Sequence, residues 1–155
     1  MDDLDKQIIA VLVADARSSY AEIGAVVSLS APAVKRRVDR LRAAGVIRGF
    51  TAVVDPAAIG WSTEAFVELF CEGRTSPARI AAATGRHPEV VAAYTVSGQA
   101  DALVHLRAAD ISHLEQALER LRAEPFVSSS RSTIVLSRLV ETPGTQFLPA
   151  PSKPA

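Results

Sequence analysis

The segment between Ser30 and Gly45 constrains the fold of this chain more than any other part of its sequence. At about 100° per residue, its bulky aliphatic residues fall on one narrow stripe, formed by Val34, Val38 and Leu41. The almost opposite side carries Pro32, Arg36 and Arg40, and these are flanked by Lys35 and Arg37. The pattern predicts a helix that packs by its aliphatic stripe and presents a basic surface.

The ends of this helix, and the residues before it, predict a helix-turn-helix. Ser30 is the expected N-cap, Pro32 lies in the first turn, where a missing N–H costs nothing, and Gly45 ends the helix. An earlier helix is expected from the acidic start to about residue 15, with apolar residues at helical spacing: Leu4, Ile8, Val11 and Leu12. A second, capped by Ser18 or Ser19, is expected to run to about residue 27, so residues 28–30 form a tight turn before the third. Three short helices in this order are typical of DNA-binding domains.

The basic residues are concentrated in one place. The whole chain has 17 basic and 17 acidic residues, yet residues 30–48 hold six basic residues and one acid. Arginine pairs with guanine edges and both basic types neutralise phosphates, so this surface suits duplex DNA. The residues predicted to contact DNA are Ser30, Ala31, Pro32, Lys35, Arg36, Arg37 and Arg40. The alternative interpretation is a solvated, charged helix that covers a small bundle.

The sequence after Gly45 predicts a linking strand and then an α+β domain. Residues 46–54 are rich in β-branched residues and Asp55-Pro56 stops them, so we expect a wing or linking strand there. Four further strands are expected at residues 63–71, 90–97, 102–108 and 127 to about 139. Helices are expected from Ser76-Pro77 to about residue 87 and from Asp110 to Pro125. The order strand-helix-strand-strand-helix-strand is the βαββαβ arrangement of ferredoxin-like domains.

The predicted organisation therefore has four parts. They are a helix-turn-helix DNA-binding domain at residues 1–49, a linking strand at 50–61, a ferredoxin-like dimerisation and effector-binding domain at 62–140, and a flexible, proline-rich tail at 141–155. No apolar run reaches the roughly 18 residues of a membrane span and the chain begins with acids, so we expect a cytoplasmic protein.

The residues that most often carry catalysis or bind metals are scattered. The soft metal-ligand candidates are Cys71, His87, His105 and His113, and no pair of them has the spacing of a zinc site. There is also no glycine-rich phosphate loop. We therefore predict no metal, no cofactor and no catalytic residue, and we interpret Trp61 as a packing residue.

Taken in order, several stretches make the sequence resemble the Lrp/AsnC family of leucine-responsive, or feast/famine, regulators. The resemblance covers roughly residues 2 to 140. The matching stretches are residues 4–9, 29–41, 45–50, Asp55-Pro56 with Gly60, His87-Pro88-Glu89-Val90, Gly98-Gln99-Ala100-Asp101 and the closing strand. Each stretch alone is a weak signal, whereas their order and spacing are specific.

This resemblance implies a winged helix-turn-helix and a regulatory domain that forms homodimers, which assemble further, commonly into octamers. It also implies an amino acid or a related metabolite as effector, bound in a cleft between subunits. By position, the cleft residues are Ser97, Gly98, Gln99, Ala100 and Asp101, with Ser130 and Ser132 from a neighbouring subunit. From the residues alone, the simpler interpretation is that Gly98 and Asp101 build a β-turn. This sequence has Ala100 where the family often has an aromatic residue.

The leading hypothesis is a sequence-specific transcription regulator that binds double-stranded DNA and responds to an amino acid, and not an enzyme. Two other functions remain open at this point. One is an architectural DNA-binding protein without an effector. The other is a relative of tetrapyrrole decarboxylases, because a fold does not fix a function.

Overall fold

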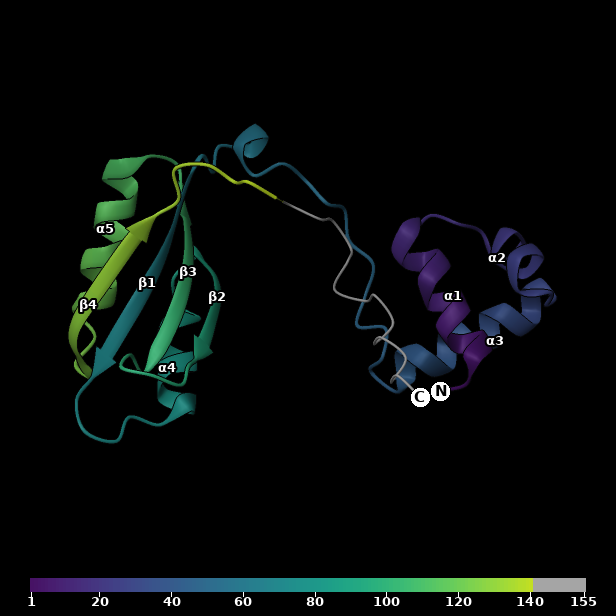
Figure 1. Ribbon diagram of the computed structural model, residues 1–155, viewed down its shortest axis with the longest axis horizontal. Coiled ribbons are helices and arrows are strands. Elements are labelled where there is room, and N and C mark those ends of the chain that lie inside the picture. Colours follow the sequence, from purple (N-terminus) through teal and green to yellow (C-terminus); the bar gives the residue numbers. More distant parts are fainter. Residues whose placement is uncertain (141–155) are drawn as a thin grey trace, which may run out of the picture. The chain divides into compact units, whose positions relative to one another are not determined.

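The computed structural model describes residues 1–140, and the chain divides into two compact units (Figure 1). Unit 1 is formed by Met1–Val53 and unit 2 by Val54–Leu139. The tail predicted to be flexible, residues 141–155, lies outside the described residues. Within residues 1–140, no helix is long and apolar enough to cross a membrane.

Unit 1 contains the three predicted helices, which are α1 (Asp3–Ala14), α2 (Tyr20–Val27) and α3 (Ala31–Ala43). The N-cap of α2 is Ser19, which forms a reciprocal capping box with Glu22, as Asp2 does with Asp5 at the start of α1. Ser28 is the one non-glycine residue of the described chain with a positive φ, 56°, and its left-handed backbone turns the chain from α2 toward α3.

The core of unit 1 consists of aliphatic residues that the three helices contribute together. They are Ile8, Leu12, Ile23, Val27, Val34 and Val38. The predicted aliphatic stripe of α3 is therefore confirmed as its buried side, and Leu41 is buried as well. Because this side is fixed inward, the opposite side of α3, which carries Arg36, faces outward.

Residues 46–54 do not form the predicted wing or linking strand. The N–H groups of Val46 and Ile47 instead donate to the Leu41 carbonyl and close the end of α3. The residues that follow have no strand beside them within residues 1–140, and an isolated strand leaves its backbone groups unpaired. Within the predicted linking strand at 50–61, Ala57–Ile59 forms a single 3₁₀ turn, and Gly60 (φ 89°) follows it.

Unit 2 has the predicted α+β order. Its elements are β1 (Thr63–Cys71), α4 (Pro77–Thr84), β2 (Val90–Thr95), β3 (Ala102–Ala108), α5 (Ile111–Arg122) and β4 (Val127–Ile134). The sheet order is β2-β3-β1-β4 and its paired strands are antiparallel, which confirms the ferredoxin-like arrangement. Four elements end earlier than predicted, at Thr84, Thr95, Arg122 and Ile134.

The two faces of the sheet have different surroundings. On β1, Ala65, Val67 and Leu69 are buried together with residues of α4 and α5 such as Ile80 and Leu114. The alternate residues of β1 lie on the other face, which we call the open face, and the register adds residues of β2, β3 and β4 to it. The open face includes Glu64, Phe66, Glu68, Phe70, Tyr94, Leu103, His105 and Arg131.

Candidate nucleic-acid interface and ligand-binding turn

Arg36 is the basic residue of α3 that lies opposite the buried stripe. Its side chain is exposed, and within residues 1–140 it makes no ion pair or hydrogen bond. Lys35 is also exposed, but it donates to Asp39 on the same helix at 2.6 Å. Pairs of this kind on a solvated helix are weak, so Lys35 can exchange Asp39 for another anion at small cost.

Arg37 and Arg40 turn toward the start of α1. Arg37 donates from Nη1 to both carboxylate oxygens of Asp2, at 2.9 and 2.7 Å, and to Asp5 at 2.8 Å. Arg40 donates from Nη2 to both oxygens of Asp5, each at 2.9 Å. We call these four residues the α1–α3 charge cluster. The sequence placed these acids only at the start of the first helix, and no local pattern indicates a pairing across more than thirty residues.

The charge cluster changes the acidity of its two carboxyl groups. The hydrogen bond from Arg37, together with the Asp5 N–H, lowers the pKa of Asp2 to about 2. Burial by itself raises the pKa of Asp5, but the Asp2 N–H and Arg37 outweigh burial and the pKa is lowered. Both acids are therefore held in their charged form.

The predicted effector-binding turn joins β2 to β3. Gly98 has a φ of 141°, a conformation that favours glycine, and no atom lies near the position a Cβ would take. Ala100 is buried, at 7% exposure, whereas Ser97, Gly98 and Gln99 are exposed. The turn therefore offers open backbone at its tip and is anchored at its base.

Asp101 forms that base and ties the turn to the end of β1. Its N–H donates to the Leu69 carbonyl at 2.9 Å, and its carboxylate accepts the Cys71 N–H at 2.7 Å. Asp101 thus builds the turn, as the simpler interpretation of the sequence held, and its side chain remains exposed.

Ser130 and Ser132 lie on β4, on the helix-covered face of the sheet. Ser130 pairs in register with Leu69 and accepts a hydrogen bond from Arg122 Nε at 2.8 Å. Ser132 pairs in register with Val67. Leu69 and Cys71, two residues further along β1, both contact Asp101, so within one chain Ser130 lies at the same end of the sheet as the turn.

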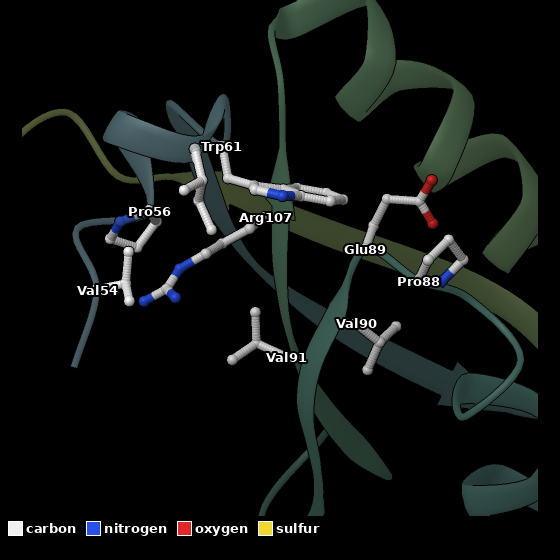
Figure 2. Close-up of a pocket in the computed structure, with 9 residues that line it drawn as sticks. Val54, Pro56, Trp61, Pro88, Glu89, Val90, Val91 and Arg107 are labelled. Atoms are coloured by element: carbon white, nitrogen blue, oxygen red, sulfur yellow. The ribbon is translucent and has the colours of Figure 1, made fainter. Parts of the chain in front are cut away.

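A concave region lies at the end of the sheet opposite to this turn and was not singled out from the sequence. It has a volume of about 340 Å³ and is lined by Val54, Pro56, Ile59, Trp61, Pro88, Glu89, Val90, Val91 and Arg107 (Figure 2). In Figure 2 the Arg107 guanidinium lies on the Val54 side of this pocket, and the Glu89 carboxylate points away from Arg107.

Glu89 is directed to α5, where it has partners of its own. It is buried, at 3% exposure, and accepts hydrogen bonds from His113 Nε2 at 2.9 Å and Arg120 Nη2 at 2.5 Å. Burial by itself raises the pKa of Glu89, but the backbone N–H, His113 and Arg120 outweigh it and lower the pKa. The ring of Trp61 lies 5.9 Å from that of His113, so Trp61 packs beside this cluster.

The other metal-ligand candidates also make contacts within unit 2. His105 hydrogen-bonds with Glu64 and stacks on Phe66, with 4.7 Å between the ring centroids. Across residues 1–140, no three or more His, Cys, Asp or Glu side chains are grouped so that they would hold a metal ion.

Two family models match the two units. The AsnC-type helix-turn-helix domain matches residues 1–42, and the Lrp/AsnC ligand-binding domain matches residues 64–145. Among curated proteins, the HTH-type transcriptional regulator Rv2324 of Mycobacterium tuberculosis is 55% identical over 141 residues, which span 91% of this chain and 95% of that protein.

Solved structures show the same similarity. The feast or famine regulatory protein Rv3291c of M. tuberculosis, in complex with L-methionine, superposes with a TM-score of 0.84 and 33% identity over 90% of this chain and 95% of that one. The transcriptional regulator NMB0573 of Neisseria meningitidis, also in complex with L-methionine, superposes with a TM-score of 0.82 and 26% identity over 92% and 94% of the two chains.

Proposed function

Since the chain belongs to the Lrp/AsnC family of helix-turn-helix transcription regulators, we propose that α3 contacts duplex DNA and that an amino acid bound at the β2–β3 turn controls this contact. The proposal has three parts, which concern the DNA-contacting residues, the effector site and the assembly of subunits.

The DNA-contacting surface is the outward side of α3 and its first turn. It comprises five of the seven residues expected from the sequence, namely Ser30, Ala31, Pro32, Lys35 and Arg36. The other two, Arg37 and Arg40, are left out because they are paired with Asp2 and Asp5. The observation that carries this part is the exposed guanidinium of Arg36, which lies opposite a stripe of fully buried valines and so is held outward by the core. A recognition helix reads the major groove mainly with residues of its N-terminal half, where these five residues stand.

Charge reversal at Arg36 tests this surface. The variant Arg36→Glu should lose retention of a duplex that the unaltered chain has selected from a random-sequence library, because a carboxylate repels phosphates and cannot bond to guanine. The matched control is Arg74→Glu, which changes the net charge equally but lies exposed in unit 2. Equal retention of the selected duplex by Arg36→Glu and Arg74→Glu would contradict the assignment.

The effector site comprises Ser97, Gly98, Gln99, Ala100 and Asp101, with Ser130 and Ser132 supplied by a neighbouring subunit. Open backbone at Gly98 suits close approach of a carboxylate, and the exposed Asp101 side chain suits an ammonium group. Two structural relatives are in complex with L-methionine, which supports an amino acid as the ligand class.

A thermal-shift screen of the twenty amino acids tests the effector. A ligand that binds only the folded state raises the melting temperature by mass action, and L-methionine is the first compound to examine. The variant Gly98→Val should abolish the shift, because a β-branched residue is strained at a φ of 141° and covers the open backbone. No shift with any amino acid would contradict this part.

The assembly is a homodimer that associates further into an octamer. The open face of the sheet carries exposed aromatic residues, Phe66 and Tyr94, beside the charged pair Glu68 and Arg131. A face that holds both an apolar centre and opposite charges suits self-complementary pairing about a two-fold axis. Sedimentation of Phe66→Glu should show smaller species than sedimentation of the unaltered chain, and unchanged species would argue against this face.

A further inference from the structure

The α1–α3 charge cluster lies beside the exposed surface of α3 and is not part of it. We propose that Asp5 is a positioning residue, which sets the rotation of α3 about its axis so that Arg36 meets DNA, and that Arg37 acts through Asp5 and Asp2 without touching DNA. This inference rests on the proposed DNA-contacting surface and adds to it the part of unit 1 that orients that surface.

Asp5 is the buried centre of the cluster. Its side chain is 1% exposed, and it accepts hydrogen bonds from the Asp2 N–H at 3.1 Å, from Arg37 at 2.8 Å and from Arg40 at 2.9 Å. A buried carboxylate tolerates few alternative arrangements, because each lost partner leaves an unsatisfied charge. The bonds therefore fix where the middle of α3 lies relative to the first turn of α1.

Two sets of contacts hold α3, the apolar core contacts and the ion pairs of the charge cluster, and they lie on different sides of the helix. Val34 and Val38 hold one side in the core, and Arg37 is turned about 65° from that stripe, toward α1. Arg36 is turned about 170° from the stripe. Apolar contacts alone allow a helix to rotate about its axis by small angles. The ion pairs of Arg37 on a second side of α3 restrict this rotation and so fix the direction of Arg36.

Arg37 is a poor candidate for a phosphate contact. Its side chain is 21% exposed, and three carboxylate oxygens already surround Nη1. A phosphate that approached it would also meet the half-exposed carboxylate of Asp2. The two arginines and two aspartates of the cluster balance in charge, so this flank of α3 attracts DNA much less than Arg36 does.

Neutralising Asp5 distinguishes a positioning role of the cluster from direct contact of its arginines with DNA. The two roles predict opposite changes in the affinity for DNA. If Arg37 and Arg40 were phosphate ligands that Asp5 restrains, Asp5→Asn would release them, and DNA would bind more tightly with a steeper dependence on salt. If Asp5 positions α3, the same variant weakens binding to the selected sequence and leaves the salt dependence unchanged. A merely structural role would lower the melting temperature without changing the choice between DNA sequences.

The experiment measures affinity by fluorescence anisotropy over a series of salt concentrations. The probes are a duplex that the unaltered chain has selected from a random library and a scrambled duplex of the same composition. Asp5→Asn should bind the selected duplex about ten-fold more weakly than the unaltered chain does, a loss comparable to that of one base contact. Its affinity for the scrambled duplex should equal that of the unaltered chain. The matched control is Asp3→Asn, which removes an exposed acid from the same turn of α1 and should leave both affinities unchanged.

Arg37→Gln gives a second test that does not require the Asp5 variant to be stable. It should weaken binding to the selected duplex while the slope of log affinity against log salt stays the same, whereas loss of one phosphate contact lowers that slope by about 0.9. A lowered slope for Arg37→Gln, or unchanged or tighter binding by folded Asp5→Asn, would overturn the proposal. The Arg36 surface is judged separately by Arg36→Glu, so a failure of the role of Asp5 can be distinguished from a failure of that surface. Failure of the unaltered chain to enrich any duplex would contradict DNA binding itself, and the role of Asp5 with it.

Discussion

Gly24 and Leu29 are in direct backbone contact across the turn between α2 and α3. The Leu29 N–H donates to the Gly24 carbonyl at 2.9 Å, and a Cβ on Gly24 would lie 2.3 Å from the Leu29 carbonyl oxygen. Because both partners are main chain, neither can rotate away. The closeness of the turn, and hence the angle at which α3 leaves α2, depends on the absence of a side chain at residue 24.

We therefore predict that Gly24→Ala destabilises unit 1. Elsewhere in a helix this change stabilises by about 0.5–1 kcal/mol, because alanine has the better helix propensity. Here the added methyl group forces the turn open, so we expect a net loss of about 1–3 kcal/mol. Urea denaturation followed by circular dichroism measures the difference, and Gly49→Ala is the control because nothing lies within 4 Å of its Cβ position. A Gly24→Ala chain as stable as the Gly49→Ala chain would show that the turn can relax.

A second prediction concerns the buried Glu89 of unit 2. Glu89→Gln keeps the size of the side chain but leaves Arg120 without a charged partner, and its amide cannot accept from His113 and Arg120 as well as a carboxylate does. Hydrogen bonds to charged groups contribute about 1.5–3 kcal/mol, and we expect a loss of that order in the free energy of unfolding. Glu115→Gln, an exposed change on α5, the helix that carries His113 and Arg120, should have little effect. Equal stability of the two variants would mean that the cluster around Glu89 adds nothing to the fold.

A third prediction separates the two roles of Asp101. Asp101→Asn keeps an oxygen that can accept the Cys71 N–H, whereas Asp101→Ala removes it. We therefore expect Asp101→Asn to melt close to the unaltered chain without ligand but to lose the thermal shift with amino acids, because an amide attracts an ammonium group weakly. Asp101→Ala should lose both stability and ligand response. A full thermal shift in Asp101→Asn would show that the carboxylate serves the turn alone.

The sequence predicted the features of the fold that depend on local periodicity and on the residue types found at turns and helix ends. The stripe of Val34 and Val38, a cap of α2 at Ser18 or Ser19, a helix that starts at Asp110 and the order of strands in unit 2 are of this kind. The structure confirms them, with Ser19 as the cap of α2. The prediction of a linking strand at 50–61 was wrong, because β-branched composition indicates a preference for extended backbone but not the presence of a partner strand.

The least predictable features are contacts between residues far apart in the chain. Nothing in the local pattern around Arg37 indicates Asp2 as its partner, and the helical period places Arg37 equally well toward solvent or toward a neighbouring helix. The contact of Asp101 with Cys71 is similar, because it requires the register of β1 against β3. Such pairings decide which of the predicted site residues are available to a ligand.

The charge cluster also predicts how the stability of unit 1 depends on pH. The pKa of Asp2 falls from an ordinary 3.8 to about 2 in the folded chain, and that of Asp5 is also lowered. A lowered pKa means that the folded state favours the charged form, so this contribution to stability is fully present above about pH 4 and is lost as the pH falls toward 2. Arg37→Gln should flatten the fall in melting temperature between pH 4 and pH 2 because it removes the first cause of the Asp2 shift, while Arg74→Gln should leave the curve unchanged. If both variants follow the unaltered chain over this range, the cluster does not contribute to the acid sensitivity of the fold.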